Sequence, residues 1–543
     1  MGIKRYLANA DTTITNAYKE NMTTRGTGSN MGRADSLEVF SIYGQESTGS
    51  SELSRILVNF PLSTISTDRS AGTIPKSGSV SFYLRMFNAA TPYTVPRNFT
   101  LWVGAISGSD KGPPSLNTYD FNWQEGNGID MEGYTDVTRN GIGANWINMG
   151  SSSTHGVLKW GYQSDPSVGG AFYTDASSSF TQTFTVGTED LEIDISPLVE
   201  QWINSSGNVL GSKPAYGLGI HLTGTQEAYV SAAEATTNSP ANVTGSQRSY
   251  YTKKFFARSS EFFFKRPIIE ARWDSAKKDD RGNFFYSSSL ATGEENLNTL
   301  YMYNYFRGQL RNIPTLANQV IYVSLFSGSA DNSTPSGSRL VLVKDLPTAN
   351  VVSAPFTYVT GGVTSTPGIY TASFALTAAT SPLTTLFDVW SSGEGGTEYH
   401  TGTIEPTVLH LGDESPSTRF VTSVTNLKPV YSTAETARFR VFTRQKDWNP
   451  SIYTKAVATI PPLIVESGSY SVTRMIDGLQ AIPFGTGSSL HTQMAFDVSG
   501  SYFDLDMGLL EPGYSYKFNF AYYNGAIGGW EEQPQEFRFR VEE

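Results

Sequence analysis

The sequence contains no cysteine, which excludes disulfide bonds, thiolate zinc sites and cysteine nucleophiles. Charged residues make up only 16% of the chain, a low share for a helical cytosolic enzyme. No run of about 18 apolar residues occurs, so no transmembrane helix is expected. Each domain must therefore be stabilised by burial of an apolar core alone.

Targeting signals and an excess of positive charge are also missing. The stretch MGIKRYLANADTTI has no apolar segment of the kind found in signal peptides. Tyr6 stands where a myristoylation signal prefers Ser or Thr. The formal net charge is -11, which disfavours a phosphate-binding surface. We expect a protein made in a cytoplasm, with neither a membrane nor a nucleic acid as its partner.

Motifs of common enzymes do not occur. The sequence lacks HExxH, GxSxG and GxxxxGK[ST]. His400 and His410 could be drawn with Asp413 and Glu414 as a metal site, but a solvated polar loop is the favoured interpretation. The glycine-rich stretches RGTGSNMG and FGTGSS do not open a helix that could bind an anion, so they are expected to be turns.

Closely spaced carboxylates are common, yet they are weak candidates for catalysis. Asp504 and Asp506 form one such pair, and Asp190, Glu192 and Asp194 form a series. Residues i and i+2 of a strand share one face about 7 Å apart, usually the solvated face. A glycosidase needs two carboxyl groups that face each other across a cleft. The spacing therefore does not predict an active site.

An acidic, glycine-rich loop leaves calcium open as an alternative. Glu125, Asp130, Glu132 and Asp136 crowd the stretch WQEGNGIDMEGYTD. Hard oxygen ligands on a flexible loop suit calcium, but the spacing does not match an EF-hand. The favoured interpretation is a solvated loop. We expect no catalytic residue, no cofactor and no metal ion.

What the sequence does contain is a two-residue alternation typical of strands. It is clear in four segments, Val80–Met86, Arg438–Phe442, Tyr514–Phe520 and Phe537–Val541. Each segment has one apolar and one polar face, as antiparallel strands do. The final FRFR stretch is expected to be a closing strand and not a basic patch. With 51 glycines and 13% aromatic residues, the composition also indicates short strands and tight turns.

One short helix is predicted at SPLVEQWINSSG. Ser196 is its expected N-cap, Pro197 its first residue, and Gly207 lies beyond its end. Helical spacing relates its apolar residues Leu198, Val199, Trp202 and Ile203. This helix should close one end of a β-sandwich, whereas the segment 299–309 is ambiguous.

Breaks in the strand pattern divide the chain into three β domains. The charged stretch SAKKDDRG follows the strand-like PIIEARW, and prolines and acidic residues interrupt the pattern between residues 402 and 418. We expect a jelly-roll β-sandwich over 1–275, an immunoglobulin-like or fibronectin-like domain over 276–408, and a C-terminal β-sandwich over 409–543. The predicted fold class is all-β.

Eight segments of the first domain resemble a known family by their order. They are NADTTITNAY, SRILVNFPLSTI, SVSFYLRMFNA, FNWQEGNGID, GANWINM, DLEIDISPLVEQWIN, AYGLGIHL and FFARSSEFFFKRPIIEARW. This order resembles the DNRLRE, or disaggregatase-related, jelly-roll module, which is grouped with carbohydrate-binding-like domains. Arg55 matches the Arg of the family's SR.LL.F.L..I strand, and Glu261 matches the Glu of its F.S.E segment. The resemblance implies that Arg55 and Glu261 hold an early strand to a late one.

The remaining two domains resemble parts of virus particles. GIYTASFAL, TTLFDVWSSG and TEYHTGTI look like an immunoglobulin-like or fibronectin-like unit. AIPFGTG and SYFDLDMGLLEPGYSYKFNF are similar to C-terminal β domains in structural proteins of tailed phages of marine bacteria. The resemblance implies a non-enzymatic virion protein present in several copies, bound to other virion proteins. A decoration, a connector and a fibre, baseplate or neck part all fit.

A glycan-binding adhesin module that recognises a host-surface polysaccharide is the main alternative. Five tryptophans of the first domain could stack on sugar rings, although core packing is favoured for each: Trp102, Trp123, Trp146, Trp160 and Trp202. A polysaccharide-degrading enzyme is a third possibility, supported only by the loose carboxylates. Exposed, clustered aromatic side chains would favour glycan binding, whereas large flat apolar patches would favour assembly.

Overall fold

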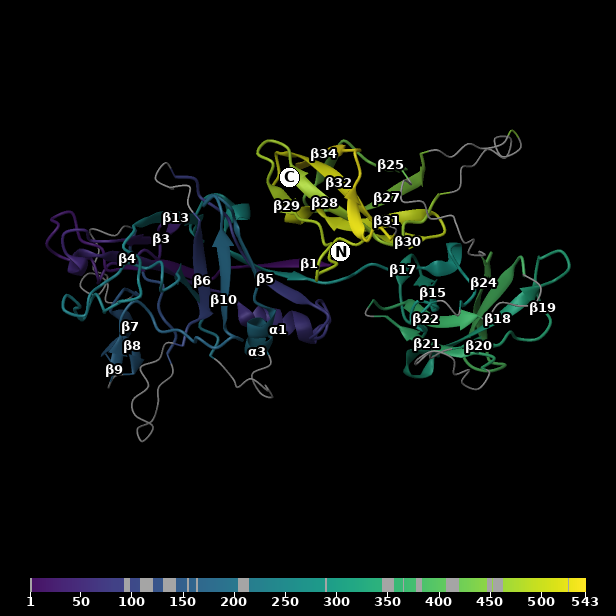
Figure 1. Cartoon of the computed structure of the whole chain (residues 1–543). Coiled ribbons are helices and arrows are strands. Elements are labelled where there is room, and N and C mark those ends of the chain that lie inside the picture. Colours follow the sequence, from purple (N-terminus) through teal and green to yellow (C-terminus); the bar gives the residue numbers. More distant parts are fainter. Residues whose placement is uncertain are drawn as a thin grey trace. The chain divides into compact units, whose positions relative to one another are not determined.

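The computed structural model of the chain is nearly all β, as predicted (Figure 1). It describes residues 2–91, 98–107, 121–129, 143–153, 156–162, 165–203, 214–288, 291–343, 356–364, 366–376, 383–406, 419–446, 452, 462–525 and 527–543. The chain divides into an N-terminal unit, Ile3–Trp273, and a C-terminal unit, Asp274–Glu543, which includes Gly2. The three-domain division stays a prediction, and its second boundary lies outside the described residues.

Two antiparallel sheets form the N-terminal unit. The smaller sheet has the order β1 (Ile3–Leu7), β14 (Ile268–Arg272), β5 (Ser81–Met86) and β11 (Leu191–Asp194). The larger sheet has the order β10 (Ser179–Phe184), β6 (Phe99–Ala105), β12 (Leu218–Leu222), β4 (Glu52–Asn59), β3 (Ser36–Ile42) and β13 (Tyr250–Phe256), with β2 (Ala10–Thr15) also paired to β4. A small sheet adds β7 (Asn148–Ser152), β8 (Gly156–Tyr162) and β9 (Asp165–Ser167).

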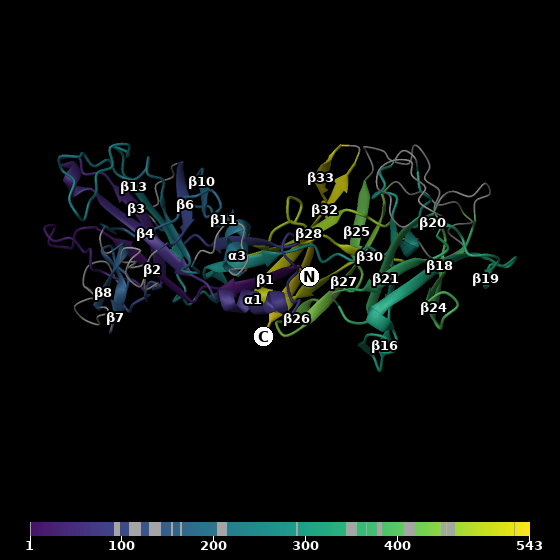
Figure 2. The same ribbon diagram turned by 90° about the horizontal axis from the view of Figure 1, so that it is seen from below.

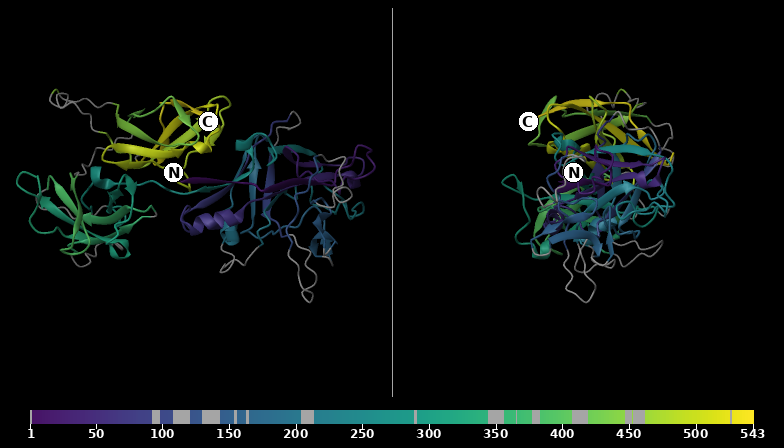
Figure 3. Two further views of the ribbon diagram at one scale, coloured as in Figure 1. Left: turned by 180° about the vertical axis from the view of Figure 1, so that it is seen from behind. Right: turned by 90° about the vertical axis from the view of Figure 1, so that its left-hand side faces the viewer.

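The strand order of the N-terminal unit is that of a jelly roll. Eight of its strands, in chain order, are β1, β4, β5, β6, β10, β11, β12 and β14. The smaller sheet takes the first, eighth, third and sixth of them, and the larger sheet takes the second, seventh, fourth and fifth. These are the two interlocked Greek keys of a jelly roll. Strands from both ends of the unit, purple β1 and teal β14, thus pair directly (Figure 3).

Alternating residues of the strands fill the space between the two sheets. Ile56 and Val58 of β4 join Leu84 of β5 in one buried apolar cluster. Leu57 points to the opposite face of the larger sheet and joins a second cluster that contains Trp146. The larger sheet is therefore covered on both faces, because loop segments pack over its outer side.

Two helices, α1 (Leu62–Ser70) and α3 (Ser196–Ile203), contribute to the core of the N-terminal unit. The helix α3 is present where it was predicted, and its apolar residues Leu198, Val199 and Trp202 are buried, but it begins at Ser196, the residue expected to be its N-cap. Gly207, which was expected to lie beyond the end of this helix, is outside the described residues. The helix α1 was not predicted, because LSTISTDRS buries only Leu62 and Ile65 and has no wider apolar stripe.

The first sheet of the C-terminal unit is antiparallel and encloses its own apolar cluster. Its strands are β15 (Asn298–Tyr303), β22 (Ile369–Leu376), β21 (Val359–Val363), β18 (Val320–Gly328), β23 (Leu386–Ser391) and β24 (Glu398–Ile404), with β19 (Pro335–Ser336) on β18 and β20 (Leu342–Val343) on β22. A separate hairpin joins β16 (Tyr305–Phe306) to β17 (Gln309–Leu310). The ambiguous segment 299–309 is therefore β structure.

Two further sheets of this unit form a sandwich (Figure 2). One contains β25 (Phe420–Val424), β27 (Thr436–Gln445), β31 (Gly500–Asp506) and β30 (Ala495–Asp497). The other contains β26 (Val430–Ser432), β34 (Phe537–Glu542), β32 (Ser515–Asn524), β28 (Gly468–Arg474) and β29 (Gln480–Ile482), with β33 (Gly529–Glu532) on β32. Aromatic rings meet between them, such as Phe439 and Phe518 with centroids 4.7 Å apart. The FRFR stretch belongs to β34, as predicted.

Candidate functional site

The outer face of the larger jelly-roll sheet carries the Arg of the opening strand. Arg55 donates from Nε and Nη2 to the two carboxylate oxygens of Glu227, at 2.9 and 2.8 Å. Its Nη1 donates to the carbonyl oxygen of Gly169 at 2.9 Å. The guanidinium carbon also lies 5.3 Å from the centre of the Trp146 ring. Arg55 therefore fastens two loop segments to the middle of β4.

The predicted contact between Arg55 and Glu261 is wrong. Glu227 is the carboxylate that pairs with Arg55, and Glu261 is exposed. Arg258, in the segment that was expected to reach Arg55, donates instead to Glu125 at 2.8 Å. The physical reason is that Arg55 points to the outer face of β4, where the segment after β12 crosses the sheet.

The described part of the acidic loop does not support a calcium site. Both carboxylate oxygens of Glu125 accept hydrogen bonds from Arg258, and one of them also accepts from the Asp11 backbone N–H at 2.9 Å. A carboxylate held by a guanidinium is a poor ligand for a second cation. Asp130, Glu132 and Asp136 lie outside the described residues. Within the described ranges no three His, Asp or Glu side chains gather as a metal site would require.

Three aromatic rings form a platform on the outer face of the larger sheet. Trp102 of β6 stands in register with Thr181 of β10 and His221 of β12. The Trp102 ring centre lies 4.6 Å from that of His221 and 5.7 Å from that of Phe172. All three rings are partly exposed. We call Trp102, Phe172 and His221 the aromatic platform.

Two glycines let the rings of the aromatic platform lie close to the sheet. A Cβ on Gly104 would come within 2.0 Å of Trp102 Cη2. A Cβ on Gly219 would come within 2.0 Å of Phe172 Cε1. Any larger residue at either position would push the ring outward. Part of the Trp102 ring and part of the Phe172 ring therefore lie over backbone, and the planes of these two rings meet at 64°.

Uncharged polar side chains border the aromatic platform. The hydroxyl oxygens of Thr100 and Thr183 are 3.0 Å apart, and the Gln226 side-chain oxygen accepts from the Thr100 N–H at 2.8 Å. Burial, followed by the nearby Arg55 charge, lowers the pKa of His221 to about 4. The imidazole is therefore neutral near pH 7. The platform and its border together present aromatic rings, hydroxyl groups and an amide.

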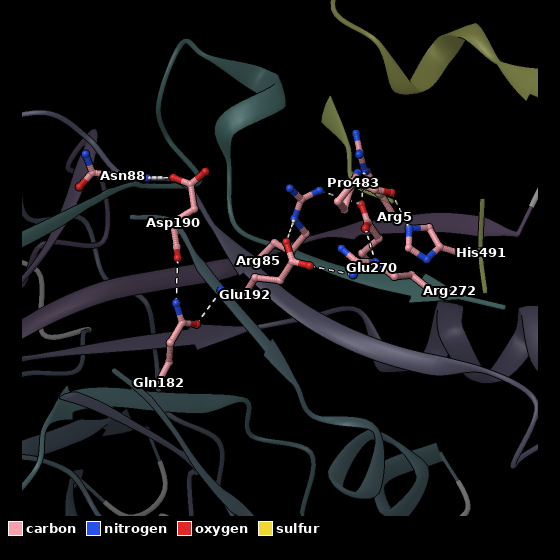
Figure 4. A network of polar contacts seen from close by, with 10 residues as sticks. All are labelled: Arg5, Arg85, Asn88, Gln182, Asp190, Glu192, Glu270, Arg272, Pro483 and His491. Atoms are coloured by element: carbon pink, nitrogen blue, oxygen red, sulfur yellow. Dashed lines mark hydrogen bonds and ion pairs between the residues drawn. The ribbon is translucent and has the colours of Figure 1, made fainter. Parts of the chain in front are cut away.

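A second charged cluster crosses the smaller sheet (Figure 4). Glu270 of β14 accepts from Arg5 and Arg272 at 2.7 Å each, and Arg85 lies 3.2 Å away. Glu192 of β11 pairs with Arg85 at 3.1 Å and with Arg272 at 2.7 Å. Burial alone would raise the pKa of Glu270, but Arg85, Arg5 and Arg272 hold it well below its usual range. These pairs link all four strands of the sheet.

The carboxylates considered for catalysis are engaged in structural contacts. Asp190 accepts from the Asn88 N–H at 2.7 Å, and Asp194 accepts from the Ser196 N–H at 2.9 Å. Asp504 accepts two hydrogen bonds from Arg438, at 2.7 and 2.9 Å. Asp506 accepts from the Gly508 N–H at 2.9 Å. Arginines and backbone N–H groups therefore occupy oxygens of each of these carboxylates.

The other candidates from the sequence contribute no further site. His400 is exposed on β24, whereas His410, Asp413 and Glu414 lie outside the described residues. The stretches 25–32 and 484–489 contain no helix, as predicted. Four of the five tryptophans are core residues with exposures of 0–5%, namely Trp123, Trp146, Trp160 and Trp202. Trp102 differs from these four because it alternates with Leu101 and Val103, which face the core.

The C-terminal unit exposes apolar side chains at several places, two of which also carry an arginine. The β16–β17 hairpin carries Tyr305 and Phe306, which are 61% and 55% exposed, and Arg307 lies 5.3 Å from the Phe306 ring centre. An open pocket of about 580 Å³ has Ile476 and Arg538 in its lining. Ile476 is 76% exposed. Apolar side chains next to arginine are typical of protein–protein contact sites.

Comparisons add no relative to these observations. No protein-family model matches the chain, and no curated protein matches it. In the part of the chain that the structure describes, no helix is both long and apolar enough to span a membrane. Function is therefore inferred from the residues and their geometry.

Proposed function

We propose that the chain is a non-enzymatic structural protein of a tailed-phage particle, bound through its β domains to other virion proteins. The ordered segments of residues 1–275 and the stretch SYFDLDMGLLEPGYSYKFNF support this proposal by their resemblances. The jelly-roll strand order agrees with the first of them. A decoration, a connector and a fibre-, baseplate- or neck-associated part all agree with such an architecture.

The observation that carries the proposal is the exposed hairpin of the C-terminal unit. Its turn residues Arg307 and Gly308 have φ values of 51° and 77°, the left-handed geometry of a tight hairpin turn. The turn projects Tyr305 and Phe306 away from the core that Leu300 and Met302 of the preceding strand enter. Full burial of one such aromatic side chain stabilises a contact by roughly 1.5–3 kcal/mol.

A protein present in many copies in a particle can be held by contacts that are individually weak. A hairpin with two aromatic side chains and an arginine offers a small interface. If many copies occupy symmetric positions, each copy is held by several such contacts at once, and the combined affinity exceeds that of any one contact. A multicopy virion protein can therefore rely on surfaces of this size.

The non-enzymatic part of the proposal rests on the carboxylates. Glu125, Glu192 and Asp504 are each paired with an arginine. Such pairs occupy the carboxylate oxygens that a general acid or nucleophile would use. These carboxylate–arginine pairs stabilise the fold, and this structural role accounts for where the carboxylates lie.

Composition of the purified particle tests the proposal. Mass spectrometry of gradient-purified virions of the encoding phage should detect the chain at a fixed ratio to the main capsid protein. The variant Tyr305→Ser/Phe306→Ser should be depleted from particles yet abundant in the lysate, with an unchanged melting temperature. The control is Val243→Ser, at a position 62% exposed in the N-terminal unit, which should be incorporated normally.

Two results would count against this proposal. Absence of the wild-type chain from intact virions, with abundance in the soluble lysate, would overturn the structural role itself. Normal incorporation of Tyr305→Ser/Phe306→Ser would show that the hairpin is not the contact. Density for the chain on the particle, seen by cryo-electron microscopy, would then identify the contacting surface.

A further inference from the structure

We propose that the side chains of Lys253 and Asn88 join in an isopeptide bond, which cross-links β13 to the segment after β5. This covalent modification of the N-terminal unit goes beyond the structural role and does not depend on it. Lys253 Nζ donates to Asn88 Oδ1 at 2.7 Å, so the two groups that react are already in contact. A carbonyl bond is about 1.2 Å long, which places the Asn88 side-chain carbon within about 4 Å of Nζ. Reacting atoms at such a separation need little further movement.

Strand pairing brings the two side chains to the same face of the larger sheet. Asn88 lies opposite Phe255 in an isolated antiparallel bridge, and the Phe256 N–H donates to the Phe87 carbonyl oxygen at 3.1 Å beside it. Side chains alternate between the faces of a strand, so Lys253 and Phe255 share one face, and Asn88 shares it as the cross-strand neighbour of Phe255. The fold therefore holds together two groups that are 165 positions apart in the chain.

The surroundings of the lysine favour the uncharged amine that the reaction needs. Lys253 is 2% exposed, and its Nζ lies 5.0 and 5.1 Å from the ring centres of Phe184 and Phe255. Burial lowers the pKa of Lys253 to about 8, against the opposing effect of the Asp190 and Glu189 charges. About one such side chain in ten is therefore uncharged at pH 7, against fewer than about one in a thousand for an ordinary lysine. The apolar rings also limit the access of water, which could attack the same carbon.

Asp190 is the carboxylate placed to carry a proton between the two nitrogens. Its Oδ1 accepts from the Asn88 backbone N–H at 2.7 Å, which holds it beside the residue to be attacked (Figure 4). Of the charged groups that act on the Lys253 amine, Asp190 has the largest effect. The carboxylate of Glu189, by contrast, accepts from the backbone N–H groups of residues 185–187. We therefore assign the proton transfer to Asp190.

The reaction balances without an oxidant, a reductant or a co-reactant. The neutral amine of Lys253 attacks the side-chain carbon of Asn88, a new C–N bond forms, and the bond from that carbon to the amide nitrogen breaks. One proton of the attacking nitrogen passes through the Asp190 carboxylate to the departing nitrogen, which leaves as ammonia. The product amide keeps one N–H. The carbonyl oxygens of Gly187 and Glu189, 3.1 and 2.5 Å from Nζ, are its acceptors.

Mass spectrometry of the full chain tests the proposal. Because ammonia is lost, the intact mass should be about 17 Da below the mass calculated from the sequence, once any removal of Met1 is accounted for. A tryptic digest should contain a branched peptide that joins Lys253 to Asn88, since trypsin does not cleave after an acylated lysine. Lys253→Arg and Asn88→Ala should each have the full calculated mass. The control is Lys254→Arg, at the neighbouring lysine that pairs with Glu38, which should lose ammonia as the wild type does.

A conservative variant separates the proton transfer from folding. Asp190→Asn keeps the shape of the side chain and an acceptor for the Asn88 N–H, so its circular dichroism spectrum should match that of the wild type. The yield of the branched peptide should nevertheless fall at least tenfold. A cross-link that closes so long a loop removes many conformations from the unfolded chain. Unlinked Asp190→Asn should therefore melt roughly 10–20 °C below the wild type.

The proposal fails if the wild-type chain has its full calculated mass and its digest yields Lys253 and Asn88 only in separate peptides. Lys253 is then a buried cation held by three carbonyl oxygens. A loss of ammonia without the branched peptide also overturns the proposal, because an asparagine can lose ammonia by cyclising onto its own backbone. Branched peptide at the wild-type level in Asp190→Asn would refute the assigned proton transfer. None of these outcomes depends on whether the chain is found in virions, so the two proposals can fail separately.

Discussion

Replacement of Arg55 by methionine tests the ion pair that fastens loops to the larger sheet. The Arg55 and Glu227 side chains are 16% and 10% exposed, so both charges are largely removed from water. In Arg55→Met the apolar stem is kept, but the Glu227 carboxylate and the Gly169 carbonyl oxygen lose their donors. The variant therefore leaves a poorly solvated charge without a partner.

The expected loss of stability follows from this geometry. A hydrogen bond to a charged group contributes roughly 1.5–3 kcal/mol, and breaking a fully buried ion pair costs roughly 3–5 kcal/mol. Because the Arg55 and Glu227 side chains retain some contact with water, the lower values apply. We expect Arg55→Met to lower the free energy of unfolding of the N-terminal unit by about 2–3 kcal/mol. At roughly 2–4 °C per kcal/mol, the melting temperature should fall by about 4–12 °C.

Calorimetry and hydrogen exchange on the full chain measure this effect. The calorimetric transition gives the change in melting temperature. Hydrogen exchange followed by mass spectrometry should show faster exchange in β4 and β12, because opening of the N-terminal unit becomes easier. The controls are Arg248→Met, at an exposed arginine of the same unit, and Glu261→Gln. Neither control should change stability by more than about 0.5 kcal/mol.

A double-mutant cycle decides whether Arg55 acts through Glu227. Once Arg55 is methionine, Glu227→Gln removes a charge that has already lost its partner, so it should cost little more. The coupling energy between the two changes should reach at least about 1 kcal/mol. If the losses of unfolding free energy in the two single variants add up to the loss in the double variant to within about 0.5 kcal/mol, the pairing is refuted. The pairing would also be refuted if Glu261→Gln lowered the free energy of unfolding as much as Glu227→Gln does.

Four further predictions concern titration and packing. Arginines hold the pKa of Glu270 below its usual range, so the stability that its charge contributes is present above about pH 4.3 and is lost as the pH falls below that value. The melting temperature should therefore fall more steeply from pH 7 to pH 3 in the wild type than in Glu270→Gln. Burial raises the pKa of Asp11 to about 7, so the stability that depends on its protonated form is lost as the pH rises through that value. The melting temperature of Asp11→Asn relative to that of the wild type should therefore be higher at pH 8 than at pH 5. An equal difference at both pH values would contradict this. An NMR titration of His221 should have its midpoint near 4, and a midpoint near the ordinary value of about 6.5 would contradict the burial argument. Gly104→Ala should displace the neighbouring indole and lower the melting temperature, whereas Gly224→Ala, where a Cβ would meet nothing within 4 Å, should not.

The sequence by itself determined the all-β class and many of the strands. A strand with one face in a core alternates every second residue, and that period can be read from neighbours such as Phe82 and Leu84 without knowledge of the fold. The helix α3 was predictable for a similar reason, because Pro197 and the spacing of Leu198 and Trp202 are local signals. Core packing was the favoured interpretation for Trp102 as well, but Trp102 alternates with the core residues Leu101 and Val103 and therefore lies on the opposite face of the sheet.

Only the tertiary structure decided which distant residues meet. Arg55 and Glu227 are separated by 172 positions, and no local signal favours Glu227 over Glu261 as the partner. The aromatic platform required β6 and β12 to be neighbours, which follows from the jelly-roll strand order and not from either segment alone. The helix α1 forms from a Ser- and Thr-rich segment of weak helical propensity because Leu62 and Ile65 reach the core. Local periodicity specifies strands, whereas long-range pairing, set by burial across the whole unit, specifies sites.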